Sequence, residues 1–184
     1  MPSAENPVSS GFNLDDAIRK VPDFPKPGIL FYDITSVIAN PDAFRYCVES
    51  MARLYRSERI DAVAAIESRG FLFAAPFCER LGIPLLLVRK KGKLPGKTIG
   101  RKYALEYGEA EIEMHVDDIP VGGRVLIIDD LIATGGTVCA TAELLRAGGA
   151  EPVGVFAVIG LPFLDYTACL GDLPVTTLIE YFGE

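Results

Sequence analysis

Residues 125–137, Val-Leu-Ile-Ile-Asp-Asp-Leu-Ile-Ala-Thr-Gly-Gly-Thr, constrain the fold of this chain more than any other stretch. The run 125–128 is apolar and β-branched at three of four positions, which predicts a central strand buried on both faces. Asp129 and Asp130 end this run, and a glycine turn at 133–137 then opens a helical pattern. Open α/β sheets bind ligands outside the carboxyl ends of their strands, so a ligand site is expected at the two acids.

The residue types in this stretch indicate a sugar-phosphate site. A glycine turn that opens a helix presents free backbone N–H groups and the positive end of the helix dipole, so it can hold a phosphate without lysine. The two aspartates can accept hydrogen bonds from ribose hydroxyls. A P-loop would need Gly-Lys-Ser/Thr and a dinucleotide loop would need G-x-G-x-x-G, and neither is present. A plain strand-to-helix turn remains the alternative.

Composition limits the class of protein. With 184 residues and 49% apolar content, the chain can form one domain with one core. No apolar run reaches the length of a membrane helix, and the N-terminus lacks a signal-peptide pattern, so we expect a cytoplasmic protein. The net charge of −7 should repel nucleic acid, so an anionic ligand would need a local basic patch.

The four cysteines predict neither a disulfide framework nor a zinc site. They lie at least 30 residues apart, without a C-x-x-C pair, and His115 is the one histidine that could join them. We therefore expect free thiols and no structural zinc. We interpret His115 as an ordinary strand residue.

Hydrophobic patterns predict alternating strands and helices. Helices are expected at 13–20, capped by Asn13, at 42–57, at 70–81 before Gly82, and at 162–170. Parallel strands are expected at 62–66, 84–88, 125–128, 153–159 and 175–179. Such alternation predicts an α/β fold with a five-stranded, mostly parallel sheet flanked by helices.

A second polar turn follows the strand predicted at 62–66. Glu67-Ser68-Arg69-Gly70 could grip the other end of a ligand held at 125–137, because parallel strands place their carboxyl ends at one sheet edge. A capped helix start explains this tetrapeptide equally well.

A basic run follows the strand predicted at 84–88. Residues 89–102 hold seven of the 18 lysines and arginines within 14 positions and contain no acid. Glycines and a proline interrupt the run, which favours a mobile loop that closes over a polyphosphate. A solvated basic face is the alternative. Residues 103–116 then predict a returning hairpin, with Ala110, Ile112 and Met114 on one face and the glutamates on the other.

Residues 21–33 predict a rigid loop, because three prolines and a glycine exclude regular helix. The loop also carries Phe24, Leu30, Phe31 and Tyr32, and aromatic loops of this kind often line a flat pocket. A strap packed over the core is the alternative. Residues 1–10 are expected to be disordered.

These motifs together carry a family resemblance. The stretch 125–137 resembles the phosphoribosyl pyrophosphate (PRPP) signature of the type I phosphoribosyltransferases. Phe-Pro-x-Pro-Gly-Ile-x-Phe-x-Asp-Ile at 24–34, Ser-Arg-Gly-Phe-Leu-Phe at 68–73, Arg-Lys-x-Gly-Lys-Leu-Pro-Gly at 89–96 and Leu-Glu-Tyr-Gly at 105–108 follow in order. Over nearly the whole chain they resemble the adenine-specific branch of that family.

The resemblance implies an activity and an organisation. It implies transfer of the phosphoribosyl group of PRPP to adenine, giving AMP and pyrophosphate, in a cytoplasmic, homodimeric enzyme of purine salvage. Mg²⁺ would be bound mainly through PRPP or pyrophosphate. It also implies a small hood at 11–35 over the carboxyl edge of the sheet, joined by the terminal segment, and a phosphoribosyltransferase core at 36–184 with a flexible loop at 90–106.

The resemblance also assigns site residues. For PRPP and AMP, Asp129 and Asp130 would bind the ribose hydroxyls, and the 5′-phosphate would meet Ala133, Thr134, Gly135, Gly136 and Thr137. Pyrophosphate would meet Ser68, Arg69, Gly70, Arg89 and Lys93, with one of the last two contacts allowed to cross the dimer interface. Adenine would meet backbone groups of Leu30 and Tyr32, and Arg69 at its edge. Glu106 is the candidate catalytic residue for the proton at purine N7. A surface glutamate on a hairpin is the alternative for Glu106.

Two other functions stay open at this stage. A PRPP-sensing regulator should add a helix-turn-helix or a basic RNA-binding face, and the sequence shows neither pattern. A phosphoribosyltransferase for a 6-oxopurine or orotate would differ at the 24–34 loop and at Glu106.

Overall fold

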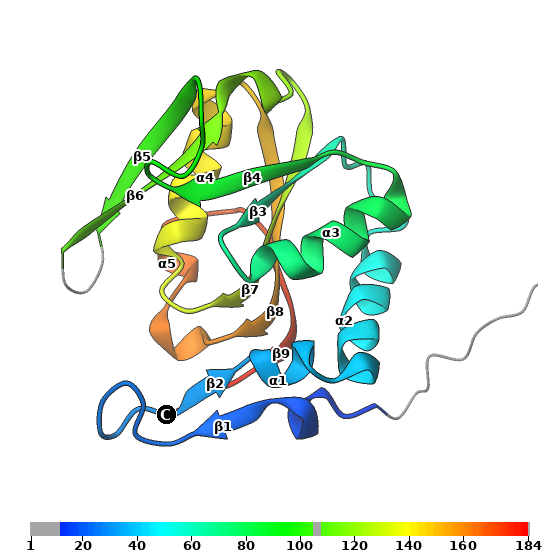
Figure 1. The fold of residues 1–184 in the computed structure, drawn as a ribbon, viewed down its shortest axis with the longest axis vertical. Helices are drawn as coiled ribbons and strands as arrows, with labels where there is room; N and C mark the ends of the chain where they lie inside the picture. The colour runs from blue at the N-terminus through cyan, green and yellow to red at the C-terminus, as the bar shows by residue number, and fades with distance from the viewer. Residues whose placement is uncertain (1–11, 105–107, 184) are drawn as a thin grey trace, which may run out of the picture.

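The structure, a computed structural model, describes residues 12–104 and 108–183. Its centre is a seven-stranded sheet with the order β5-β6-β4-β3-β7-β8-β9, shown in Figure 1. The strands are β3 (Ala62–Ile66), β4 (Leu85–Lys90), β5 (Thr98–Ala104), β6 (Glu109–His115), β7 (Arg124–Ile132), β8 (Glu151–Gly160) and β9 (Val175–Glu180). The predicted disorder at 1–10 falls outside the described residues.

The five predicted parallel strands are confirmed, but the sheet is larger than predicted. Neighbours along β4-β3-β7-β8-β9 all pair in parallel. The hairpin β5-β6 adds two antiparallel strands, because β6 pairs with the last two residues of β4, Arg89 and Lys90. The predicted hairpin began at 103, whereas β5 begins at Thr98 and takes up the second half of the basic run.

Helices cover both faces of the parallel strands (Figure 1). Side chains of α2 (Pro41–Leu54) and α3 (Gly70–Leu81) share one core cluster with Leu126 and Ile128 of β7. Side chains of α4 (Gly136–Ala147) share the other cluster with Val125 and Ile127. The side chains of residues 125–128 in β7 are all fully buried. The prediction that this strand is covered on both faces is therefore confirmed.

Capping and turn residues explain where the helices begin and end. Asn40 caps α2 by accepting hydrogen bonds from the N–H groups of Asp42 and Ala43. The helix α3 has the predicted bounds and stops at Gly82, whose φ of +66° suits glycine. The predicted helix 162–170 is broken into the 3-10 turn η3 (Pro162–Leu164) and α5 (Thr167–Leu170), because Asp165 between them has a φ of +51°. Another 3-10 turn, η2, spans Val116–Asp118.

The N-terminal part of the described chain forms a small sheet of its own. Asn13 caps, as predicted, but the helix is a 3-10 turn η1 (Leu14–Ala17) that gives way to β1 (Arg19–Val21). This strand pairs with β2 (Phe31–Asp33), which leads into α1 (Thr35–Ile38). In Figure 1 the pair lies at the bottom of the view, below the main sheet.

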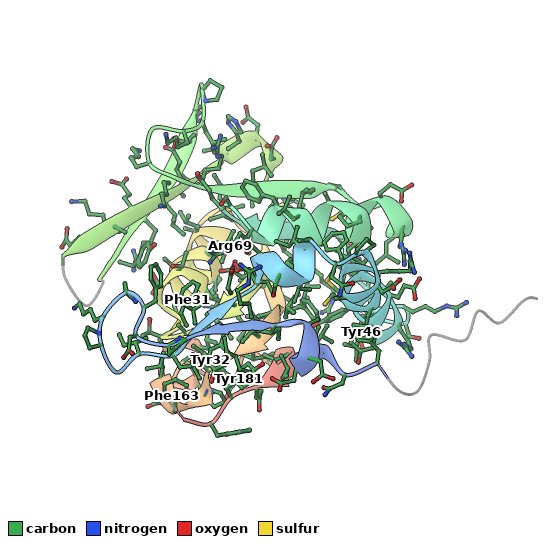
Figure 2. All side chains as sticks on the ribbon, turned by 60° about the horizontal axis from the view of Figure 1, so that its bottom comes forward. Phe31, Tyr32, Tyr46, Arg69, Phe163 and Tyr181 are labelled. Atoms are coloured by element: carbon green, nitrogen blue, oxygen red, sulfur yellow. A yellow bond between two sulfur atoms is a disulfide. The ribbon has the colours of Figure 1, made fainter. Side chains whose placement is uncertain are left out.

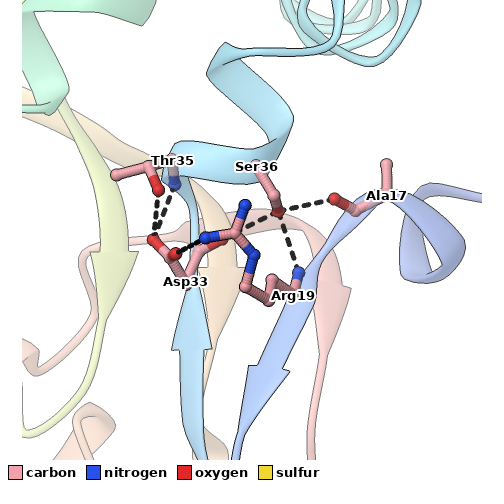
Figure 3. A network of polar contacts seen from close by, with 5 residues as sticks. All are labelled: Ala17, Arg19, Asp33, Thr35 and Ser36. Carbon is pink, nitrogen blue, oxygen red and sulfur yellow. Dashed lines mark hydrogen bonds and ion pairs between the residues drawn. The ribbon is translucent and has the colours of Figure 1, made fainter.

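A polar network fixes this two-stranded sheet (Figure 3). Arg19 Nη1 lies 3.1 Å from Asp33 Oδ2, and Asp33 Oδ1 accepts hydrogen bonds from the Thr35 N–H and hydroxyl. The Ser36 hydroxyl donates to the carbonyl oxygen of Ala17 and accepts from the Arg19 N–H. The network therefore ties β1, β2 and α1 into one unit.

Among the described residues, no helix has both the length and the apolar character needed to cross a membrane.

Candidate active site

The phosphate turn, defined here as residues 133–137, joins β7 to α4. Gly135 precedes the helix with a φ of +79°, a conformation that glycine adopts without strain. The first intrahelical bond of α4 runs from the Cys139 N–H to the Gly135 carbonyl oxygen at 2.8 Å. The N–H groups of Gly136, Thr137 and Val138 precede that bond, so they face the helix entrance with the positive end of the dipole.

A hollow of about 120 Å³ lies against this turn. It is lined by Asp129 and by residues 131–138, which include all five residues predicted to hold the 5′-phosphate. Its size and its backbone donors suit a single phosphate group.

The predicted free state of all four cysteines is wrong for two of them. Cys139 in α4 and Cys169 in α5 form a disulfide, whereas Cys47 and Cys78 are free and buried. Sequence spacing could not show this pair, because the fold brings α5 against the first turn of α4. A Cβ atom added at Gly135 would lie 3.0 Å from the Tyr166 carbonyl oxygen and 3.2 Å from Cys169 Sγ, so the phosphate turn packs tightly against this segment.

The acid pair lies inside β7 and not beyond its end, which corrects the predicted end of the strand at Ile128. The strand continues to Ile132 because β8 pairs with it that far, whereas β3 pairs only as far as Ile128. Asp129 and Asp130 therefore occupy a part of β7 that extends past β3. This step in the sheet edge gives the acids access to a pocket.

The two acids have different surroundings. Asp130 is buried, and its Oδ2 accepts a hydrogen bond from Arg69 Nε at 2.6 Å. Asp129 Oδ1 accepts a hydrogen bond from the Asp130 N–H at 2.8 Å. Burial, and then the adjacent charge of Asp130, raise the pKa of Asp129 well above its usual value.

The pyrophosphate loop, defined here as residues 67–70, follows β3 and opens α3. Ser68 and Arg69 are exposed and Gly70 is buried. A Cβ atom at Gly70 would lie 3.0 Å from the Ile128 carbonyl oxygen and 3.2 Å from Asp129 Oδ1. Glycine therefore allows this loop to approach the acid pair on the neighbouring strand.

Both polar turns open onto one pocket. A cavity of about 320 Å³ is lined by residues 66–69, Val88, Lys90, Tyr103, Ile112, residues 129–131 and Thr137. It shares Asp129, Leu131 and Thr137 with the hollow at the phosphate turn. The acid pair thus stands between two adjacent anion-sized spaces.

The basic loop, defined here as residues 91–97, lies beside this pocket. Arg89, predicted to contact pyrophosphate, has its guanidinium 3.2 Å from Glu67 Oε2 and donates from Nη1 to the Lys93 carbonyl oxygen at 3.1 Å. Lys90 lines the pocket instead, and no local pattern favours Lys90 over Arg89. Lys93 is exposed. The roles of Arg89 and Lys93 at pyrophosphate, and the flexibility of 90–106, stay predictions.

Two buried or half-buried glutamates that sequence reasoning did not single out organise this region. Glu67 accepts a hydrogen bond from the Lys90 N–H at 3.0 Å. Burial alone would raise its pKa, but that bond and the Arg89 guanidinium lower it. Glu113 lies on the face of β6 opposite Ile112 and Met114, as predicted, but it is only 2% exposed. The basic loop covers that face of the strand, a contact that strand alternation cannot reveal.

The residues predicted on the adenine side lie in and beside β2. Leu30 is half-buried against the core. Tyr32 is buried and stacks on Tyr181, with ring centroids 3.8 Å apart (Figure 2). The Tyr32 side chain therefore packs as the strap alternative proposed, and only its backbone could meet a purine. Alternation puts Phe31 and Asp33 on the other side of β2.

Asp33 connects this strand to the pyrophosphate loop. Hydrogen bonds from Thr35 chiefly lower the pKa of Asp33, and the charges of Arg19 and Arg69 add to that effect. Arg69 therefore acts electrostatically on Asp33 and is paired with Asp130, and Phe31 shares the side of β2 that carries Asp33. Phe31 is a half-buried aromatic residue that the sequence marked only as part of an aromatic loop. Glu106, the predicted catalytic residue, lies outside the described residues.

Comparisons with known proteins agree with this geometry. Residues 33–163 match the family model described as phosphoribosyl transferase domain. The adenine phosphoribosyltransferase of Treponema pallidum strain Nichols is 63% identical over 97% of this chain and 94% of its own length. The crystal structure of adenine phosphoribosyltransferase from Thermoanaerobacter pseudethanolicus has a TM-score of 0.87 at 42% identity, over 92% of this chain and all of that one.

A further solved structure shows which ligands a relative binds. The adenine phosphoribosyltransferase of Trypanosoma brucei, in complex with AMP, pyrophosphate and ribose-5-phosphate, has a TM-score of 0.84 at 27% identity, over 91% of this chain and 77% of that one. The fold, the order of the two polar turns and the level of identity lead to one conclusion. The chain belongs to the phosphoribosyltransferase family and, within it, to the adenine phosphoribosyltransferases.

Proposed function

We propose that this protein transfers the phosphoribosyl group of PRPP to adenine and releases AMP and pyrophosphate. One observation carries the proposal: the 320 Å³ pocket and the 120 Å³ hollow share Asp129, Leu131 and Thr137. A ribose at the acid pair could therefore reach the phosphate turn with its 5′-phosphate and the pyrophosphate loop with its C1′ substituent. The ligands bound by the Trypanosoma brucei relative are of this chemistry.

The charges of the pocket match the reaction. Departure of pyrophosphate builds negative charge on the leaving group and positive charge on the ribose ring, so cations are needed around the first and anions near the second. Arg69 and Lys90 supply cations beside the pocket, and the acid pair supplies the anion. Because a guanidinium has five N–H donors, Arg69 can hold Asp130 through Nε and still offer its Nη groups to a phosphate.

The adenine side follows from β2. Backbone groups of Leu30 and Tyr32 would meet the N1 and N6 edge of the purine, and Phe31 would offer an aromatic face, since stacked rings gain stability beyond their buried area. Glu106 would take the proton from purine N7 as adenine attacks and return it in the reverse direction.

Magnesium fits this site through its ligand. Mg²⁺ prefers oxygen ligands and is commonly bound through substrate phosphates, where it neutralises their charge. The described residues contain no group of three or more possible metal-binding side chains, and the acid pair is assigned to ribose hydroxyls. We therefore assign Mg²⁺ to the oxygens of PRPP and pyrophosphate.

An initial-rate panel tests the proposed reaction. Adenine, hypoxanthine, guanine, xanthine and orotate are each supplied with PRPP and Mg²⁺, and pyrophosphate release is measured. We expect turnover with adenine that exceeds every other base by at least ~10²-fold, because a site that hydrogen-bonds one purine edge leaves polar groups unpaired with another. Faster turnover of a 6-oxopurine or orotate would overturn the base assignment. No turnover with any base, together with PRPP binding, would favour a PRPP-sensing regulator.

The homodimer and the cytoplasmic location implied by the resemblance belong to the same proposal. Sedimentation equilibrium of the full chain at several concentrations measures its mass directly. A mass of one chain at all concentrations would remove the dimer from the proposal. Fractionation of the native cells, followed by immunodetection, would test the location.

A further inference from the structure

Glu113 is a buried carboxylate that the proposed reaction leaves without a role. It lies on β6, between Arg89 of β4 and Gly100 of β5 in the strand register. A carboxylate that is only 2% exposed is costly to bury unless it is hydrogen-bonded or paired. Its partners therefore indicate what it stabilises.

The partners of Glu113 belong to the basic loop or follow it directly. Oε1 accepts hydrogen bonds from the backbone N–H groups of Lys93 and Leu94, both at 3.0 Å. Oε2 accepts from the Thr98 hydroxyl at 3.1 Å and lies 3.5 Å from Lys91 Nζ. Burial alone would raise the pKa of Glu113, but the hydrogen bonds from Leu94, Thr98 and Lys93 lower it, so the carboxylate stays charged at neutral pH.

A second contact holds the same peptide segment from its other side. Arg89 donates from Nη1 to the Lys93 carbonyl oxygen, and the same guanidinium contacts Glu67 at the start of the pyrophosphate loop. Lys93 is thus fixed through its N–H by Glu113 and through its C=O by Arg89. The basic loop and the pyrophosphate loop are held in one arrangement through main-chain atoms.

We propose that Glu113 is a positioning residue for pyrophosphate: it fixes the backbone at Lys93 and Leu94 so that the basic loop stays beside the pyrophosphate loop. This inference rests on the proposed function. It predicts a selective effect, because PRPP and pyrophosphate carry the group that the basic loop would meet. AMP carries only the phosphate held by the phosphate turn, which has no contact with Glu113 among the described residues.

Three variants of the full chain test the role. Glu113→Leu removes both carboxylate oxygens, whereas Glu113→Gln keeps Oε1 as an acceptor for the two backbone N–H groups. Glu111→Leu is the matched control, because Glu111 lies two residues earlier on β6 and contacts Lys91 alone among the described cations. Calorimetry gives the Kd of AMP, and steady-state kinetics in both directions give KM for PRPP and for pyrophosphate.

We expect Glu113→Leu to raise KM for PRPP and pyrophosphate by roughly ten- to hundredfold, the size of lost hydrogen bonds to a charged group. The Kd of AMP should change less than about twofold, because its phosphate site is separate. Glu113→Gln should restore KM to within about fivefold of the parent, because it keeps both backbone bonds. Glu111→Leu should leave both quantities near the parent values.

Other results would overturn the role. If Glu113→Leu weakened the binding of AMP and of pyrophosphate equally, the effect would be a general loss of structure. An unchanged KM for pyrophosphate would show that the contacts of Glu113 with the basic loop are not needed. If Glu113→Leu does not fold, Thr98→Val removes one hydrogen bond and should raise KM for pyrophosphate about threefold or more with AMP unaffected; no change there would also overturn the proposal. If the parent fails the base panel, direct calorimetry of pyrophosphate against AMP still decides the role of Glu113.

Discussion

The phosphate turn and the basic loop are both proposed to bind anions, yet they are built in different ways. The phosphate turn comes from one contiguous stretch in which β7, Gly135 and α4 follow one another. The basic loop is held by Arg89 and Glu113, and Arg89 in turn contacts Glu67, so its support comes from three separate parts of the chain. A contiguous site depends on local conformation, whereas the loop depends on buried contacts that only the complete fold provides. Mutations should therefore act locally at the turn and over longer distances at the loop.

The largest effect is expected at the phosphate turn. Gly136→Val places a branched side chain at the first residue of α4, where backbone N–H groups would meet the 5′-phosphate. AMP binding should fall below detection by calorimetry while the fold remains intact by circular dichroism.

The control for this change lies on the same helix. Ala147→Val adds the same kind of side chain at the exposed end of α4, far from its first turn, and should leave AMP affinity unchanged. If folded Gly136→Val bound AMP with normal affinity, the phosphate turn would not be the site of the 5′-phosphate. The contrast between a locally built phosphate site and the basic loop would then fail.

The next effect concerns proton transfer on the hairpin side of the site. Glu106→Gln keeps the shape of the side chain but cannot carry a proton, so single-turnover formation of AMP should slow by at least ~10²-fold. Adenine affinity, measured separately, should change little. Single-turnover kinetics are needed because product release or loop opening could limit the steady-state rate.

Two other outcomes would reassign Glu106. An unchanged single-turnover rate would leave it as a surface residue of the hairpin. A large loss of adenine affinity at a normal chemical rate would make it a recognition group.

The contrast between turn and loop also explains how far the sequence could predict the structure. The strand at 125–128, the helix at 70–81 and the glycine turn that opens α4 were predicted correctly, because apolar runs, glycines and caps act over a few residues. The end of β7 was placed too early because pairing with β8, and not the local sequence, carries the strand to Ile132. The extra pair of sheet strands was missed for a similar reason, since β6 joins β4 only at Arg89 and Lys90.

The misses in the site have the same origin. Alternation gave the correct face of β6 for Glu113, but it could not show that the basic loop folds over that face and buries the carboxylate. Lys90 could not be preferred to Arg89, because only the pairing of β4 decides which of two adjacent side chains enters the pocket. The Cys139–Cys169 disulfide joins residues whose proximity arises from the packing of α5.

That disulfide ties α4, which follows the phosphate turn, to α5, and its loss should have an intermediate effect on stability. It closes a 30-residue separation, and such a link contributes about 3 kcal/mol to the free energy of unfolding. The double change Cys139→Ser with Cys169→Ser should remove this contribution and therefore lower the melting temperature. AMP affinity should fall little, because Gly135 and the helix entrance are part of the contiguous stretch.

Reducing agent supplies the control for the disulfide. It should lower the melting temperature of the parent toward that of the double variant and leave the variant unaffected. Labelling of four thiols in the denatured, non-reduced parent would show that the two cysteines are not bonded.

A smaller effect is expected for Lys93, an exposed cation of the basic loop. Lys93→Ala should raise KM for pyrophosphate several-fold at low salt and less at high salt, because the side chain acts through charge in an exposed position. Lys102→Ala is the matched control, since Lys102 is exposed and lies 3.6 Å from Glu109 on the hairpin. A salt-independent effect, or none, would favour the solvated-face alternative for Lys93.

The smallest effect concerns stability at the acid pair. Burial and the charge of Asp130 raise the pKa of Asp129 in the folded chain, so between its unfolded and folded pKa values the folded chain binds more protons than the unfolded chain. The free energy of unfolding therefore decreases as pH rises through that window. Asp129→Asn has no proton to lose and keeps Oδ1 for the Asp130 N–H. It should raise stability by about 1 kcal/mol at neutral pH, in the range of trade-offs between stability and activity, and by less near pH ~4.

Asp130→Asn is the contrast for that prediction, because it removes the partner of Arg69. This change should not raise the free energy of unfolding at neutral pH, since it leaves a guanidinium without its carboxylate. Thermal unfolding of both variants and the parent from pH ~4 to pH ~8 measures the difference. Parallel stability curves for Asp129→Asn and the parent would mean that Asp129 titrates normally in the folded chain. The contrast between the phosphate turn and the basic loop would then rest only on the contacts that hold each of them. The acid pair would add no electrostatic cost to the folded state.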